Sequence, residues 1–160
     1  MRIHIAGDHA AYELQQALIA HLKEAGHDVV NHGPFGYDAQ DDYPVFVLRA
    51  AEAVAADGAS LGVVLGGSGN GEQVAANKVR GIRAVLADTP ERAALGREHN
   101  AAQIVSIGAR FTPVEAAKAI VDTFLATDFT NAERHARRVG MVTAYEQTGE
   151  LPALPGATDA

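Results

Sequence analysis

The chain contains no cysteine among its 160 residues. This absence excludes disulfide bonds, thiolate metal ligands and cysteine nucleophiles, so any chemistry has to use other side chains. A long hydrophobic run is also missing near the start of the chain. The first apolar run covers only residues 3–6 and is followed directly by Gly7. That run is far shorter than a signal-peptide core or a membrane span of about 20 residues. We therefore expect a cytoplasmic protein with no membrane partner.

Positive charge is scarce as well. Lysine and arginine number 13 against 20 aspartates and glutamates, which gives a net charge of −7. Because such a surface repels polyanions, nucleic acid is not expected as a partner, although a small basic pocket remains compatible with it. The length is typical of one domain, which we expect over residues 1–149. Residues 150–160, which contain proline and glycine, are expected to form a flexible C-terminal tail.

Short apolar runs alternate with helical patterns along the chain, which indicates an α/β fold with a parallel sheet. Strands are predicted over residues 2–7, 28–31, 61–65, 82–87 and 103–107. A first helix is predicted to end before Gly26, and further helices over residues 44–56, 72–77, 90–99, 113–126 and 131–147. The last two helices each follow a capping-box pattern, Thr112 to Glu115 and Thr130 to Glu133.

A glycine-rich loop, Gly66-Gly67-Ser68-Gly69-Asn70-Gly71, follows the third predicted strand. Backbone N–H groups in such a loop can hold an anion. The loop is not a P-loop, because Glu72 and Gln73 stand where that motif needs lysine and a hydroxyl. Glu72 also stands where a dinucleotide-binding fingerprint has its third glycine. Asp88 lies about twenty residues farther on, where that fold carries an acidic residue, so dinucleotide binding stays an alternative. A tight turn without a ligand is the remaining interpretation.

Polar side chains follow two of the predicted strands. Asp8 and His9 come after the first strand, and Ser68 and Glu72 after the third. Because the carboxyl ends of parallel strands line one edge of the sheet, these four side chains are expected to converge there. Taken alone, Asp8 could cap the first helix and Glu72 could complement a helix dipole. Their convergence favours a site.

The pair His99-Asn100 ends the fourth helix before the fifth strand, and so is expected near the opposite edge of the sheet. If these residues are functional, a second subunit of a two-fold dimer has to deliver them. Their alternative role is to cap the end of the helix, where histidine is favoured and asparagine tolerated.

Arginines form a local positive cluster in this acidic chain. Arg134 and Arg138 are four residues apart on one face of the last helix, and Arg110 follows the fifth strand. The planar guanidinium group suits phosphate because it donates two parallel hydrogen bonds. The alternative is a solvated helix face partly paired with Glu133.

Together these motifs closely resemble the type B ribose-5-phosphate isomerases over about residues 1–147. The motifs that carry the resemblance are Gly7-Asp8-His9-Ala10, Asp42-Tyr43-Pro44, the glycine-rich loop, Ala75-Ala76-Asn77-Lys78, Gly81-Ile82-Arg83-Ala84, His99-Asn100 and Arg134-His135-Ala136-Arg137-Arg138. The resemblance implies a Rossmann-like three-layer sandwich with a five-stranded parallel sheet. It also implies a homodimer with shared active sites and no metal or organic cofactor.

The resemblance has one departure. Many family members carry a cysteine base where this chain has Gly66. The chain is instead similar to the actinobacterial branch, in which a glutamate matching Glu72 serves as the base. The implied reaction is the interconversion of ribose 5-phosphate and ribulose 5-phosphate through an enediolate, a step of the pentose phosphate pathway.

The resemblance also implies a role for each remaining candidate residue. The N–H groups around Gly67, Ser68 and Gly71 would hold the oxyanion, and the Ser68 hydroxyl would add a bond. His99, helped by Asp8, would open the sugar ring, and Asn100 would hold a substrate hydroxyl or the oxyanion. The phosphate ligands would be His9, Arg110, Arg134 and Arg138. The alternatives are a six-carbon substrate such as allose or galactose 6-phosphate, a catalytically dead sugar-phosphate sensor, or a non-catalytic nucleotide-binding module.

Overall fold

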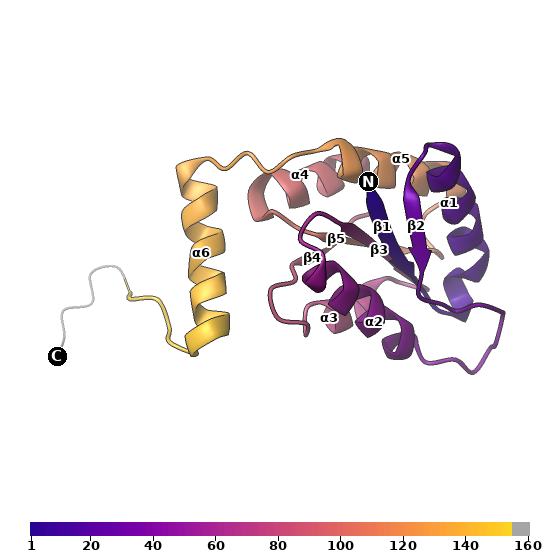
Figure 1. Cartoon of the computed structure of the whole chain (residues 1–160), viewed down its shortest axis with the longest axis horizontal. Coiled ribbons are helices and arrows are strands. Elements are labelled where there is room, and N and C mark those ends of the chain that lie inside the picture. The colour runs from indigo at the N-terminus through magenta and orange to yellow at the C-terminus, as the bar shows by residue number, and fades with distance from the viewer. Residues whose placement is uncertain (155–160) are drawn as a thin grey trace.

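The computed structural model describes residues 1–154. The chain forms five strands, six α-helices and one short 3-10 helix (Figure 1). The strands are β1 (Arg2–Ala6), β2 (Asp28–Asn31), β3 (Leu61–Gly66), β4 (Ala84–Leu86) and β5 (Ile104–Gly108). The helices are η1 (His9–Ala11), α1 (Tyr12–Glu24), α2 (Tyr43–Ala56), α3 (Asn70–Ala76), α4 (Pro90–Asn100), α5 (Val114–Ala126) and α6 (Glu133–Thr148).

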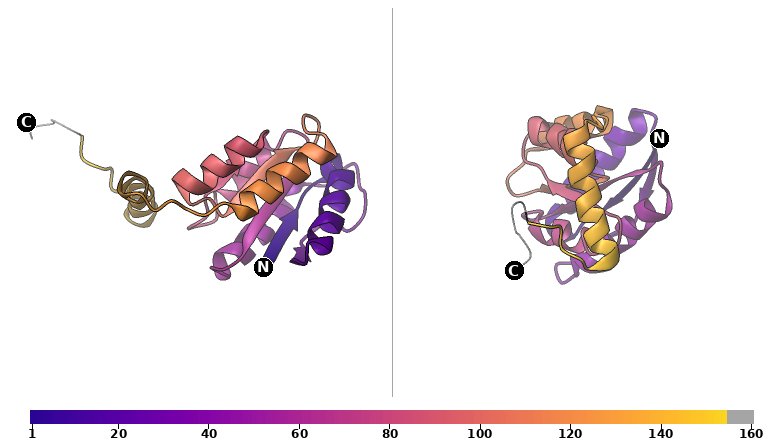
Figure 2. Two further views of the ribbon diagram at one scale, coloured as in Figure 1. Left: turned by 90° about the horizontal axis from the view of Figure 1, so that it is seen from above. Right: turned by 90° about the vertical axis from the view of Figure 1, so that its left-hand side faces the viewer.

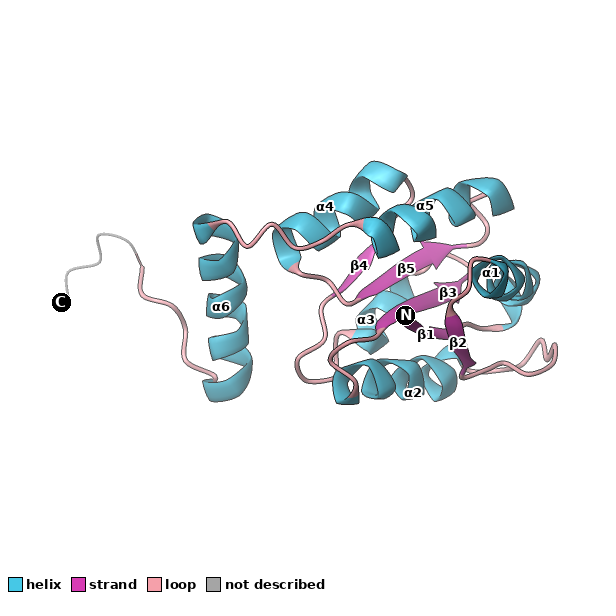
Figure 3. Ribbon diagram, turned by 45° about the horizontal axis from the view of Figure 1, so that its top comes forward, coloured by secondary structure: helices cyan, strands magenta, loops and turns pink. Residues whose placement is uncertain are grey.

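The five strands form one sheet in the order β2-β1-β3-β5-β4, and every pairing is parallel. Helices α1, α4 and α5 cover one face of this sheet, and α2 and α3 cover the other (Figure 3). The α/β class and the three-layer arrangement predicted from the sequence are confirmed. All carboxyl ends of the strands therefore lie along one edge.

The core follows from the alternation of side chains along the strands. Ile3 and Ile5 of β1 pack with Phe124 of α5 on one face of the sheet. Ala6 and Val64 point to the other face and pack against α2 and α3. Every residue of the central strand β3 is buried, as expected for a parallel strand covered on both faces.

Helix α6 stands apart from the sandwich (Figure 2). Its start is fixed to the end of α4, where the hydroxyl of Thr130 donates a 2.8 Å hydrogen bond to the carbonyl oxygen of Glu98. Farther along, Glu146 accepts a 2.9 Å hydrogen bond from the N–H of Gly81. The only buried residue of the helix is His135. Helix α6 therefore leaves most of its surface unpacked within this chain.

The two predicted capping boxes are wrong. Helices α5 and α6 begin after Pro113 and Ala132, and neither N-cap residue makes a side-chain capping bond. The Thr130 hydroxyl is used instead to fasten α6 to α4. Thr89, in contrast, caps α4 by accepting a hydrogen bond from the N–H of Arg92 at 3.3 Å. The predicted bounds of the elements differ from the observed ones by at most two residues, and the strand over residues 28–31 is matched at both ends.

Residues 150–154 form neither helix nor strand, and the rest of the predicted tail, 155–160, lies outside the described residues. The division into a domain over 1–149 and a tail over 150–160 stays a prediction. Within the described part of the chain, none of the helices has the length and apolar character needed to cross a membrane.

Candidate active site

A cavity of about 240 Å³ opens at the edge where β1, β3 and β5 end. It lies between the segments that follow these strands and the start of α2. Its lining residues are Asp8, His9, Ala10, Tyr43, Gly67, Ser68, Gly71, Glu72 and Arg110. Seven of the candidate residues named from the sequence are thus brought together, because parallel strands deliver their following loops to one edge.

Glu72 is buried at the back of this cavity, with 3% of its surface exposed. Gly69 adopts a left-handed conformation (φ 78°) at the start of α3, and Glu72 lies in the first turn of that helix. A β-carbon at Gly66 would overlap the Glu72 carboxylate, so the absence of a side chain there makes room for it. Burial raises the pKa of Glu72 above its ordinary value, and the nearby charge of Asp8 raises it further.

The cavity holds further polar groups beside Glu72. The Asp8 carboxylate accepts a 3.2 Å hydrogen bond from the N–H of Ala11, so it caps the 3-10 helix while facing the cavity. The hydroxyl oxygen of Ser68 accepts hydrogen bonds from the backbone and side-chain nitrogens of Asn70, each at 3.3 Å. Because Ser68 accepts both bonds, its own hydrogen remains available as a donor.

Arg110 brings a guanidinium group into the cavity. Its backbone N–H donates to the carbonyl oxygen of Gly67 at 3.1 Å, which joins the loops after β5 and β3. A β-carbon on Gly67 would lie 3.1 Å from Cζ of Arg110, so the glycine allows the guanidinium group to lie close against the loop. The cavity therefore carries positive charge from Arg110 opposite the carboxylates of Asp8 and Glu72.

His99 does not line this cavity. It lies at the end of α4, near the edge where the strands begin, and its ring centroid is 4.2 Å from that of His135 on α6. His135 Nε2 accepts a 3.1 Å hydrogen bond from Arg134 Nε, and its Nδ1 is 2.9 Å from the hydroxyl of Thr130. Burial lowers the pKa of His135, and the neighbouring charges of His99 and Arg134 lower it further. His135 thus joins His99 to α6.

Asn100 and the arginines of α6 share this second location. The carbonyl oxygen of Asn100 accepts a 2.7 Å hydrogen bond from Arg83, which fixes the end of α4. Glu133 forms an ion pair with Arg137 at 3.6 Å. The ion pair that was expected between Glu133 and the basic helix face therefore involves Arg137. Arg134 and Arg138 are exposed and make no ion pair with a carboxylate in residues 1–154. Both remain available to an anion.

Two residues of the cavity region were missed by the sequence reasoning. Tyr43 lies against Gly71, where a β-carbon would be 2.8 Å from the ring. Asp41 accepts a hydrogen bond from the His9 ring at 2.6 Å. Tyr43 lies in one of the motifs that carry the resemblance, which could have drawn attention to it. Asp41 gave no signal, because it is one of several acidic residues in a loop.

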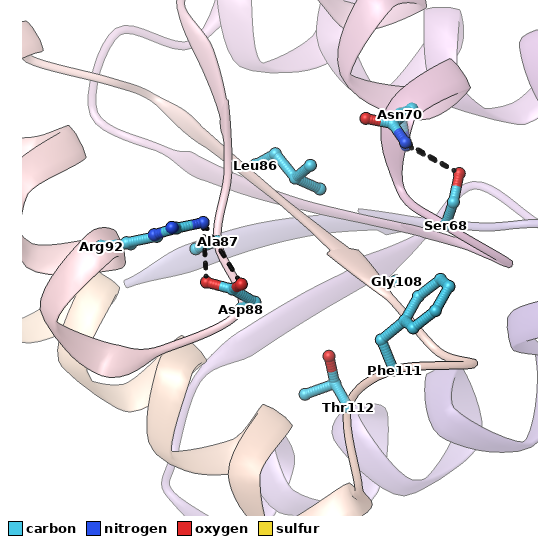
Figure 4. A pocket seen from close by; sticks show the side chains of 9 residues that line it. All are labelled: Ser68, Asn70, Leu86, Ala87, Asp88, Arg92, Gly108, Phe111 and Thr112. Atoms are coloured by element: carbon cyan, nitrogen blue, oxygen red, sulfur yellow. Dashed lines mark hydrogen bonds and ion pairs between the residues drawn. The ribbon is translucent and has the colours of Figure 1, made fainter.

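A second cavity, of about 200 Å³, lies beside the first at the ends of β4 and β5 (Figure 4). Asp88, the residue that kept dinucleotide binding open, lines it and forms an ion pair with Arg92 at 3.1 Å. Arg92 lies one helical turn farther on, so the Asp88 carboxylate is engaged by its own helix start. This arrangement gives no support to a ribose-binding role for Asp88.

The described residues contain no group of three or more histidine, aspartate or glutamate side chains able to hold a metal ion. The candidate residues instead divide into two locations. One is the cavity around Glu72, and the other is the surface made by His99, Asn100, Arg134 and Arg138. These locations lie at opposite edges of the sheet, because the first follows the carboxyl ends of β1, β3 and β5, whereas α4 ends just before β5 begins.

Comparison with known proteins places these features in a family. Residues 3–142 match the ribose/galactose isomerase family. The chain is 53% identical over 157 residues to ribose-5-phosphate isomerase B of Mycobacterium tuberculosis, covering 98% of this chain and 97% of that one. It is 38% identical over 140 residues to the Escherichia coli ribose-5-phosphate isomerase B, covering 88% and 93%.

Solved structures agree with this assignment. A ribose-5-phosphate isomerase B from Mycoplasma genitalium with bound ribulose-5-phosphate superposes with a TM-score of 0.89 at 37% identity, covering 92% of this chain and 97% of that one. The type B enzyme of Trypanosoma cruzi gives 0.87 at 43% identity, covering 93% and 98%. The chain therefore belongs to the ribose/galactose isomerase family, among the type B ribose-5-phosphate isomerases.

Proposed function

We propose that the chain interconverts ribose 5-phosphate and ribulose 5-phosphate by proton transfer between C2 and C1 through an enediolate. The observation that carries this proposal is the buried Glu72 carboxylate in a cavity at the strand ends. The substrate is supported by relatives up to 53% identical that are named ribose-5-phosphate isomerase B and by the ribulose-5-phosphate bound in the Mycoplasma genitalium structure. The reaction is a step of the pentose phosphate pathway.

Glu72 is the proposed base. A carbon next to a carbonyl group is a weak acid, so the base has to be held close and has to stay basic near neutral pH. Burial supports this role, because it raises the pKa of the Glu72 carboxyl toward the working pH. Glu72 would remove the proton from C2 and return it to C1.

The negative charge that develops on the substrate oxygen needs donors already in place. The N–H groups of Gly67, Ser68 and Gly71 and the hydroxyl of Ser68 are the proposed donors, since all three residues line the cavity. Donors fixed in this way stabilise the transition state without reorganising, and the loss of one typically costs about 10²–10³ in turnover.

The phosphate would be held by His9 and Arg110 together with Arg134 and Arg138 of the partner subunit. His99 of the partner subunit, with Asp8, would open the ring, and Asn100 of the partner subunit would hold a substrate hydroxyl. A homodimer is supported by the placement of these groups at opposite edges of one chain. The exposed apolar side chains of α6, Met141, Val142 and Tyr145, support the packing of this helix on a second copy.

The proposal includes no metal, no organic cofactor and no nucleic-acid partner. A cytoplasmic location is part of it, because a sugar phosphate is charged and does not cross membranes unaided. A six-carbon sugar phosphate is the second candidate substrate, since the ribose/galactose isomerase family takes its name from galactose as well as ribose. The names of the mycobacterial relatives at 50–53% identity favour the five-carbon sugar.

The test is turnover of ribose 5-phosphate in EDTA by the wild type, by Glu72→Gln and by Glu52→Gln, with allose 6-phosphate as a parallel substrate. Glu52 is an exposed residue of α2 and serves as the matched control. We expect Glu72→Gln to lose about 10²–10⁴ in kcat, as is typical for a general base, with a nearly unchanged KM. If Glu72→Gln kept most of the wild-type activity, Glu72 could not be the base. Preferred turnover of allose 6-phosphate would reassign the substrate.

A further inference from the structure

Asp41 has no place in the mechanism above, yet it is tightly engaged with His9. Two nitrogens of His9 donate to the same carboxylate oxygen of Asp41: the ring Nδ1 at 2.6 Å and the backbone N–H at 3.1 Å. Asp41 lies in the loop between β2 and α2, and 6% of its side chain is exposed. Both the backbone and the ring of His9 are therefore fixed by one buried carboxylate.

The second oxygen of Asp41 makes this contact unusual. It is buried and has no hydrogen-bond partner within residues 1–154. A buried carboxylate is costly unless an opposite charge compensates it. The His9 ring is the one cationic group that forms an ion pair with Asp41 among the described residues. The geometry therefore favours an imidazolium at His9.

The contact also determines what His9 can offer to a ligand. Because the carboxylate accepts from Nδ1, that nitrogen keeps its proton, and Nε2 is the nitrogen left for a ligand. In the neutral ring Nε2 would carry no hydrogen and would present a lone pair to a phosphate oxygen. In the imidazolium both nitrogens donate. A phosphate contact through Nε2 therefore requires the charged form of His9.

The groups around His9 act on its charge in opposite directions. The hydrogen bond to Asp41 is the largest influence and raises the pKa of His9, and Asp8 raises it further. Burial and the charge of Arg110 lower it. The other titratable residues lining the two cavities that His9 borders are Tyr12, Glu13, Tyr37, Tyr43 and Glu72. Tyr37 meets the His9 ring edge-on at 6.4 Å between centroids.

We propose that Asp41 is a positioning residue that holds His9 as a doubly protonated phosphate ligand. This inference rests on the proposed contact between His9 and the substrate phosphate. Asp41 touches no substrate atom itself. It sets which ring nitrogen faces the phosphate and keeps that nitrogen a donor at a pH where an unassisted histidine would be neutral.

The test compares Asp41→Asn with Asp42→Asn. Both variants remove one negative charge from the same loop, but Asp42 is exposed and its side chain makes no capping bond to α2. We expect Asp41→Asn to raise the KM for ribose 5-phosphate about tenfold near neutral pH with little change in kcat, the size expected for one charge-assisted hydrogen bond. Asp42→Asn should leave both values within about twofold of the wild type.

The pH dependence separates positioning from a structural role. Below the pKa of His9 in both proteins the ratio of the two KM values should fall toward one, because both rings are then charged. The ratio should grow as the pH rises and the variant loses its imidazolium first. The substrate phosphate, whose second pKa is about 6, titrates equally in both assays and cancels from the ratio. A ratio that stays constant with pH would overturn the proposal.

Two further measurements keep the result decisive. NMR titration of the His9 ring in the wild-type protein should give a pKa above 6.5, and a value at or below 6.5 would overturn the inference even if Asp41→Asn failed to fold. His9→Ala distinguishes the two proposals. If His9→Ala leaves KM unchanged, the phosphate role of His9 fails. If His9→Ala raises KM while Asp41→Asn does not, the role of Asp41 alone fails.

Discussion

The carboxylate of Glu72 occupies the space that a β-carbon on Gly66 would fill. On this backbone a side chain at position 66 and the observed conformation of Glu72 exclude each other. The resemblance noted from the sequence gives many family members a cysteine base where this chain has Gly66. The absence of a side chain at Gly66 and the position of the Glu72 carboxylate therefore depend on each other.

We expect Gly66→Ala to destabilise the protein by about 1–3 kcal/mol, the usual cost of overpacking, and to lower kcat because the Glu72 carboxylate is displaced. In a Glu72→Ala background the same substitution should cost less, since the overlapping atoms are gone. Urea unfolding of the single and double variants measures this coupling. Gly58→Ala is the control, because a β-carbon there meets nothing within 4 Å. Equal costs in both backgrounds would contradict the linkage.

Burial of Glu72 should reduce stability at neutral pH. Its folded-state pKa is raised, so the folded protein binds more protons than the unfolded chain between the ordinary value of 4.5 and the raised one. The free energy of unfolding therefore falls as the pH rises through this window. Glu72→Gln cannot ionise and should be more stable than the wild type at pH 7, within the range of about 0.5–2 kcal/mol typical of stabilising substitutions.

The measurement is urea unfolding of Glu72→Gln and the wild type from pH 7 down to pH 4. The difference should shrink as the pH falls through the raised pKa and approach a constant below 4.5, where both side chains are neutral. A difference that does not change with pH would show that the gain, if any, has another origin.

The arginines of α6 offer a matched pair of substitutions. Arg138 makes no ion pair among residues 1–154, whereas its neighbour Arg137 pairs with Glu133 at 3.6 Å. We expect Arg138→Ala to raise the KM for ribose 5-phosphate at least tenfold with a smaller effect on kcat, because charge-assisted bonds to phosphate act on binding. Arg137→Ala should stay within about twofold, since exposed ion pairs contribute little. Equal increases in KM for the two variants would contradict a specific phosphate contact of Arg138 and would indicate that the arginines act only through their overall positive charge.

Local chemistry explains which parts of this molecule could be predicted. The strand and helix patterns, the parallel sheet and the meeting of Asp8 with Glu72 follow from periodicity and from the geometry of parallel strands. The position of His99 away from Glu72 followed from the order of α4 and β5. These inferences needed no knowledge of side-chain contacts, because the chain connectivity alone decides which edge of the sheet each loop reaches.

Tertiary contacts decided the rest. Thr130 fits a capping box by sequence, but its hydroxyl bonds the carbonyl oxygen of Glu98 because α6 is fastened to α4 there. The contact between Asp41 and His9 joins residues 32 positions apart through a loop without a periodic pattern. The overlap at Gly66 depends on the path of Glu72 back toward β3. None of these contacts leaves a mark in local sequence.

Subunit exchange tests whether each site uses both chains. Glu72→Gln and His99→Ala should each lose nearly all activity alone, but a mixed dimer would contain one site with both defects and one with neither. After complete exchange at equal amounts, half of the dimers are mixed, so about one quarter of wild-type activity should return. The control mixes Glu72→Gln with Asp8→Ala. Both residues line the same cavity of one chain, so every site keeps a defect and no activity should return. Recovery in the control, or no recovery with His99→Ala despite proven exchange, would exclude the shared site.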